Sequence, residues 1–208
     1  MIDHDLRSPA DLPWPRKGDV LFEAADDWCH NACINLQFFN WDWYASGYKH
    51  AGDVLVQHVI DTRDHRDTLV FPIVFNYRQY LELRLKELIV VGRTLSDEAG
   101  EFPPTHNLRT LWDTCRVIIA QSDVGATDAD FDAIDDAITQ FCAADSGSDS
   151  FRYPVDRDGN PSIPDHLRVI NLRQLRDRVD ALATFLEGVS MAFSVYLDYK
   201  SDMQSAYW

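Results

Sequence analysis

One hydrophobic seam near the carboxyl end of the chain most constrains its fold. Apolar residues recur there at intervals of three and four positions, at Leu172, Leu175, Val179, Leu182, Leu186, Val189, Phe193 and Tyr196. That spacing places them on one face of a helix that extends to about Asp198, over more than three heptads. Such a seam packs against neighbouring helices of a bundle or against a second copy of the chain. It therefore predicts an all-α fold, and packing within the chain is the simpler account.

Shorter segments with helical periodicity precede the seam. Their approximate ranges are 42–63, 67–92, 106–120 and 128–142. Asp67 and Thr105 are candidate N-caps for the second and third of these helices, and Gly92 supplies a stop for the second. Residues 19–40 are apolar and aromatic with weaker periodicity, and we expect a helix over most of them.

A short non-helical insertion is predicted between the last two helices. Residues 151–155 are typical of an extended segment, and Asp158-Gly159 is a turn signal. Residues 167–170 can pair with that segment as a small β-hairpin. The predicted fold is therefore an all-α helical bundle with a small β-hairpin insertion before the long C-terminal helix.

The chain is expected to form one structural unit with a distinct amino-terminal part. Residues 1–20 include three prolines and mixed charge, which favours an irregular arm. We predict that residues 1–41 form this arm and a short helix packed on the bundle, and that residues 42–208 form the helical domain. A chain of 208 residues is long enough to bury a sizeable core.

The charge of the chain limits its partners. It has 34 Asp and Glu residues against 19 Lys and Arg, a formal net charge of −15. Nucleic acids are bound largely through Lys and Arg, so bulk charge disfavours non-specific binding, although a local basic patch can still bind RNA. No uninterrupted apolar run approaches the roughly 20 residues that cross a bilayer, and the first seven residues lack the apolar core of a signal peptide. We therefore expect a cytoplasmic protein that does not contact a membrane.

The cysteines do not indicate a metal site. Cys29 and Cys33 form one close pair, but Cys115 and Cys142 are isolated. A structural zinc site usually needs two close pairs of ligands. We expect buried free thiols, with neither a metal nor a cofactor.

Polar residues that can carry chemistry gather in two neighbouring segments. Arg78, Glu82 and Lys86 are four residues apart, so they share one face of the predicted helix. His106 and Asn107 open the next helix, where backbone N–H groups attract anions. These five residues are the candidate catalytic site, with His106 facing the other three. The alternative is two ordinary salt bridges on a helix surface.

These segments, 77–89 and 105–112, resemble the middle of a HEPN domain. The resemblance rests on an aromatic-basic helix start, a Glu and Lys four residues apart among apolar positions, and His-x-Leu at the next helix, here Tyr77, Arg78, Leu81, Glu82, Leu85, Lys86, Leu88, His106 and Leu108. It covers roughly residues 42–198. It implies a four- or five-helix bundle, often a homodimer, associated with toxin–antitoxin systems or antiphage defence.

The chain departs from the pattern of HEPN ribonucleases. Those enzymes are similar in carrying an Arg four to six residues before a His near the start of a late helix. The His can deprotonate a ribose 2′-hydroxyl, and the Arg can hold the phosphate. None of the seven histidines here has an Arg four to seven residues before it. In the nearest late cluster, which contains His166, Arg168, Asn171 and Arg173, the order is reversed.

Three functions are expected on these grounds. The first is a HEPN-like component of a prokaryotic defence or toxin–antitoxin system, divergent or non-catalytic, that forms a homodimer and acts through protein or RNA contacts. The second is an active metal-independent endoribonuclease with a non-standard site around Arg78, Glu82, Lys86 and His106. The third is an acidic interaction protein that mimics nucleic acid. Burial of the polar cluster in satisfied pairs favours the first function, and its exposure in a cleft favours the second.

Overall fold

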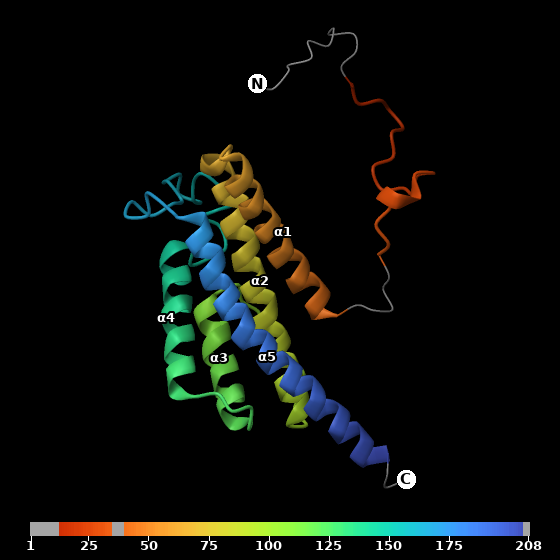
Figure 1. Ribbon diagram of the computed structural model, residues 1–208, viewed down its shortest axis with the longest axis vertical. Helices are drawn as coiled ribbons and strands as arrows, with labels where there is room; N and C mark the ends of the chain where they lie inside the picture. Colours follow the sequence, from red (N-terminus) through yellow and green to blue (C-terminus); the bar gives the residue numbers. More distant parts are fainter. Residues whose placement is uncertain (1–12, 35–39, 206–208) are drawn as a thin grey trace. The chain divides into compact units, whose positions relative to one another are not determined.

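The structure is a computed structural model that describes residues 13–34 and 40–205 (Figure 1). The chain divides into two units, Met1–Phe39 and Asn40–Trp208. This division falls close to the predicted boundary between residues 41 and 42. The predicted packing of the arm on the bundle stays a prediction.

The first unit is mainly irregular over its described part. Within residues 13–34 the regular element is a short 3-10 helix, η2 (Trp28–His30). The predicted helix over 19–40 is therefore wrong for residues 19–34, and residues 35–39 lie outside the described part of the chain. Apolar side chains of this segment, such as Leu21 and Phe22, are exposed. A short helix with no buried face gains too little to form.

The second unit is a helical bundle. Its helices are α1 (Trp41–Thr62), α2 (Arg66–Leu95), α3 (Leu108–Gln121), α4 (Asp128–Ala144) and α5 (Leu172–Ser205). α2 packs against α1, α3 and α5, and α4 packs mainly on α3 (Figure 1). The all-α prediction is confirmed, since residues 13–34 and 40–205 contain no strand.

The predicted seam of α5 forms one wall of the core. Its buried members are Leu172, Val179, Leu182, Leu186, Val189 and Phe193. Leu175 is half-buried, and Tyr196 remains partly exposed while its hydroxyl donates to the carbonyl of Asp123. Each fully buried apolar side chain contributes about 1.5–3 kcal/mol by leaving water. The seam therefore packs mainly within the chain, as predicted.

Side-chain caps set the starts of four helices, and at α5 the Asn171 side chain accepts from the Gln174 N–H. Asn40 accepts from the Trp43 N–H at the start of α1, and Asn107 accepts from the Thr110 N–H at the start of α3. α4 begins with a reciprocal capping box between Thr127 and Asp130. The predicted cap of α3 at Thr105 is wrong by two residues. Thr105 instead accepts the Asn107 N–H and holds that cap in place.

α2 begins and ends differently from the prediction. Its N-cap is His65 in the left-handed conformation, with no side-chain cap bond, so the predicted Asp67 cap is wrong. Arg63, which ends α1, is also left-handed, and the two residues close the tight turn between α1 and α2. α2 runs through Gly92 to Leu95, so the predicted stop at Gly92 is also wrong.

Gly92 is instead a point of close helix packing. A Cβ added there would overlap the Ile118 side chain and lie 3.1 Å from Cε2 of Phe193. Gly188, in α5, is exposed and has no atom within 4 Å of an added Cβ. A glycine-to-alanine substitution therefore meets a crowded site at Gly92 and open space at Gly188.

We expect Gly92→Ala and Gly188→Ala to change stability in opposite directions. Overpacking at Gly92 is expected to lower the free energy of unfolding by about 1–3 kcal/mol. Alanine is favoured over glycine inside a helix, so Gly188→Ala is expected to raise the free energy of unfolding by about 0.5–1 kcal/mol. Urea denaturation followed by circular dichroism measures both. Stabilisation by Gly92→Ala would contradict the packing of α2 on α3 and α5.

The cysteines separate by unit. Cys115 is buried in α3 and Cys142 is half-buried in α4, whereas Cys29 and Cys33 are exposed. Burial raises the pKa of the Cys115 thiol, which keeps it protonated. The prediction of buried free thiols is right for Cys115 and wrong for Cys29 and Cys33.

The segment between α4 and α5 contains a turn but not the predicted hairpin. An isolated antiparallel bridge joins Val155 and Pro161. Asp156 organises the turn by accepting the backbone N–H groups of Asp158 and Asn160, and Gly159 has the positive φ that the Asp-Gly signal indicates. Residues 167–170 carry no regular structure and do not pair with 151–155.

α5 also bears on the expected location of the protein. Among the described helices, it alone is long and apolar enough to cross a membrane by length and composition. Core helices of soluble proteins pass the same test, and a third of the tested window of α5 is buried in the bundle. The cytoplasmic location and the lack of membrane contact stay predictions.

Candidate functional site

The structure brings four of the five candidate residues together. Arg78, Glu82 and Lys86 follow one another on consecutive turns of α2, as their spacing predicts. His106 lies opposite them in the segment before α3. Arg78, Glu82 and Lys86 are buried, however, so the alternative of salt bridges on an exposed helix surface is wrong.

Arg78 is the most enclosed member of the cluster, with no exposed area. Its Nη1 donates to Oε2 of Glu82 at 3.1 Å, and its Nη2 donates to the carbonyl oxygen of His106 at 2.6 Å. Its Nε lies 3.4 Å from the carbonyl oxygen of Asp145 and 3.5 Å from its carboxylate. Arg78 therefore ties α2 to the segment before α3 and to the end of α4.

Glu82 is the hub of the cluster. Its Oε1 accepts from Lys86 Nζ and lies next to His106 Nδ1, each at 2.8 Å, while its Oε2 faces Arg78. Burial alone raises the pKa of this carboxyl, but the bonds from Lys86 and His106 outweigh it and hold the pKa below the ordinary value. The carboxylate thus stabilises the fold above the ordinary glutamate pKa, and this contribution is lost as the pH falls through the lower folded value.

His106 and Lys86 differ in their access to solvent. The His106 side chain is 71 % exposed although its Nδ1 touches buried Glu82. Lys86 is almost covered, and its Nζ lies 5.1 Å from the ring centroid of Phe102. The cluster therefore presents one imidazole to solvent and keeps its cations inside.

Asn107 serves the helix and not the cluster. Its side chain accepts from the Thr110 N–H at 3.0 Å and from the Thr110 hydroxyl at 3.4 Å. That oxygen is occupied as the cap of α3. The structure assigns Asn107 no bond to Arg78, Glu82, Lys86 or His106.

A second buried ionic network was missed from the sequence. Arg84, on another face of α2, contacts Asp42 of α1 at 2.6 Å and Glu87 at 2.5 Å. Glu187 of α5 lies 3.9 Å away and accepts from the Tyr80 hydroxyl. The network thus joins the start of α1 to α2 and α5.

Within that network, Glu87 is the buried carboxylate whose negative charge is balanced by Arg84. Its side chain is 10 % exposed, and Ser190 of α5 donates to it at 2.7 Å. Burial raises the pKa of this carboxyl, and the Arg84 guanidinium only partly offsets the rise. The spacing of Arg84 and Glu87 was visible in the sequence, but their burial was not.

The chemistry available to the first cluster is limited by its geometry. A carboxylate-oriented imidazole with one exposed nitrogen can transfer a proton. Phosphate binding needs an accessible cation, and Arg78 is fully covered while its three nitrogens face protein oxygens. Within the described ranges, no group of three His, Cys, Asp or Glu residues is placed to hold a metal ion.

No family model matches the chain, and neither a curated protein nor a solved structure shows significant similarity to it. The resemblance to HEPN domains therefore stays a prediction.

Proposed function

We propose that this protein is a HEPN-like component of a prokaryotic defence or toxin–antitoxin system that binds a protein or RNA partner without cutting RNA. One observation carries the non-catalytic part of the proposal, and the rest follows from the resemblance in sequence: Arg78 and Glu82 are sealed inside the bundle and satisfied by protein groups. Through their contacts with His106 and Asp145 the two side chains tie α2 to neighbouring segments, and they offer nothing to a phosphate. The cluster that looks catalytic in the sequence is therefore best explained as a clamp.

The proposal includes a homodimer, and α5 supports it. Beyond the core, exposed apolar residues recur every fourth position at Met191, Val195, Tyr199 and Met203. The last turns of α5 extend past the other helices (Figure 1). A ridge of residues four apart runs obliquely across a helix and can pack against the same ridge of a second copy.

A divergent ribonuclease is the second candidate, and a single feature favours it. The ring of His106 is 71 % exposed while its Nδ1 lies 2.8 Å from Glu82. A carboxylate that orients an exposed imidazole is typical of general acid–base sites. In this case the phosphate-binding cation has to come from outside the cluster.

Incubation of a mixed tRNA and mRNA pool with purified protein decides between the two candidates. We expect no cleavage above that of the His106→Ala protein, which keeps its fold because the ring is exposed. His166→Ala is the matched control, since His166 is also exposed. Cleavage that is lost in His106→Ala and kept in His166→Ala would overturn the non-catalytic proposal. A monomeric mass by light scattering would overturn the dimer alone.

A further inference from the structure

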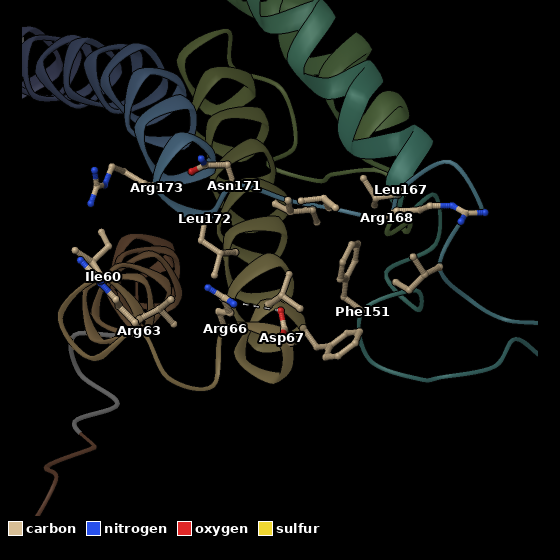
Figure 2. Close-up of a pocket in the computed structure, with 16 residues that line it drawn as sticks. Ile60, Arg63, Arg66, Asp67, Phe151, Leu167, Arg168, Asn171, Leu172 and Arg173 are labelled. Atoms are coloured by element: carbon tan, nitrogen blue, oxygen red, sulfur yellow. Dashed lines mark ion pairs between the residues drawn. The ribbon is translucent and has the colours of Figure 1, made fainter. Parts of the chain in front are cut away.

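A pocket with a volume of about 940 Å³ lies at the end of the bundle where α1 meets α2 and α5 begins. Its walls come from the end of α1, the start of α2, residues 151, 163 and 167–171, and the first residues of α5. Figure 2 shows these segments around a common space, with Leu172 and Phe151 toward its centre. This volume is within the range of roughly 300–1,000 Å³ typical of small-molecule sites.

The interior of the pocket is apolar. Phe71, Phe151, Leu167, Ile170 and Leu172 line it, and Phe151 and Leu172 are buried. Long connections without secondary structure are uncommon in compact domains and usually serve function. The segment between α4 and α5 is such a connection, and it supplies about half of the lining residues.

The rim of the pocket is basic although the chain is strongly acidic. Arg63 and Arg173 lie toward one side of it, Arg66 lies nearer the middle beside Asp67, and Arg168 points away on the other side (Figure 2). The acidic lining residue is Asp67, which lies 3.8 Å from Arg66. Among the described residues, the side chains of Arg63 and Arg173 have no hydrogen-bond or ion-pair partner.

The backbone at Arg63 adds an independent observation. This residue has φ 61° and ψ 10°, in the left-handed region that favours glycine. The conformation ends α1, where the Arg63 N–H donates to the carbonyl of Val59. Here the conformation places an unpaired guanidinium at the edge of an apolar pocket.

We propose that this pocket binds a small amphipathic anion, with an apolar body inside and a carboxylate or phosphate held by Arg63 and Arg173. Guanidinium groups match both carboxylate and phosphate oxygens, and an apolar wall favours an alkyl or ring body over a bare ion. The start of α5 lies beside Arg173, and its helix dipole also favours negative charge although Asn171 already accepts the Gln174 N–H. This site is separate from the Arg78 cluster, so it does not depend on whether the protein cleaves RNA.

Calorimetric titration of the full-length protein tests the proposal with matched ten-carbon probes below their micelle concentrations. We expect decanoate and decyl phosphate to bind. The ratio of their affinities shows which anionic group the site prefers. Decanol and decyltrimethylammonium are expected to bind at least about tenfold more weakly, and inorganic phosphate alone is expected to give no binding.

Two variants locate the binding. Arg63→Gly relieves the left-handed conformation, so lost binding cannot reflect unfolding, and Arg173→Gln removes the second unpaired cation. Each variant is expected to bind the anionic probes about threefold more weakly, and the double variant about tenfold more weakly. Arg178→Gln, at an exposed site elsewhere on α5, is the control. Any of three results would overturn the proposal. These are equal affinity for decanol and decanoate, unchanged affinity of the double variant for the anionic probes, and no binding of either anion.

Discussion

Glu82→Ala is expected to lower the free energy of unfolding by about 3–5 kcal/mol, because it leaves buried Lys86 without a carboxylate and buried Arg78 with only that of Asp145, at 3.5 Å. Arg78 has no exposed area and Lys86 is almost covered, so both cations are shielded from bulk water. His106 also loses its contact with Oε1. Urea denaturation followed by far-ultraviolet circular dichroism measures the loss as a shift of the unfolding midpoint.

Two further variants separate charge from packing in that result. Glu82→Gln keeps the shape of the side chain, so it is expected to lose less than Glu82→Ala. Asp113→Ala removes a carboxylate that pairs with Arg109 at the same i, i+4 spacing but is 61 % exposed. It is expected to cost at most about 0.5 kcal/mol. A loss in Glu82→Ala no larger than that of Asp113→Ala would show that the cluster is not a clamp.

Arg84→Ala is expected to lower the free energy of unfolding by about 3 kcal/mol at neutral pH. The loss lies at the low end of the range for a broken buried pair, because Asp42 and Glu187 are about half exposed and regain water. Glu87 is the carboxylate left buried without its cation. The same urea denaturation measures the change.

The pH dependence of the Arg84→Ala loss tests the cause. Burial raises the pKa of Glu87, so its protonated form is favoured in the folded protein. The buried charge therefore costs stability above the ordinary glutamate pKa, and this cost declines as the pH falls and the carboxyl takes up a proton. The loss in Arg84→Ala is expected to be smaller at pH 5 than at pH 7. Arg178→Ala, at an exposed position of α5, is expected to change stability by less than about 0.5 kcal/mol at both values.

Periodicity was enough to predict the helices of the bundle, because their core faces are regular. α1 and α4 start within one residue of the expected positions, and the α5 seam lies where its spacing indicates. The amino-terminal segment 19–34 failed the same reasoning because its apolar residues lack a buried partner surface. Pairing of strands depends on distant segments, so the Asp158-Gly159 turn was predictable and the hairpin was not.

Part of the candidate site could also be predicted. Four-residue spacing indicated the pairs of Glu82 with Arg78 and Lys86, and the structure places His106 beside them. Burial of the pairs could not be seen, because charged residues on a helix are usually solvated. One signal was available: apolar residues occupy every face of 77–89, and a helix that is apolar all round is buried. The pocket at the other end of the bundle depends on the path of the segment between α4 and α5, which local pattern does not determine.

The two ionic networks on α2 also restrict how its neighbours can slide. Arg78 and Glu82 face the segment before α3, whereas Arg84 and Glu87 face α1 and α5. A shift of one helical turn, about 5.4 Å, brings new apolar side chains together on purely apolar faces, and apolar contacts of similar volume can replace one another. Here such a shift would separate Glu82 from His106, Arg78 from the His106 carbonyl, and Arg84 from Asp42, so these buried groups would lose their partners outside α2. The bundle is thus expected to have one axial register. Evolutionary substitution of its apolar core residues should leave that register unchanged as long as these charged residues remain.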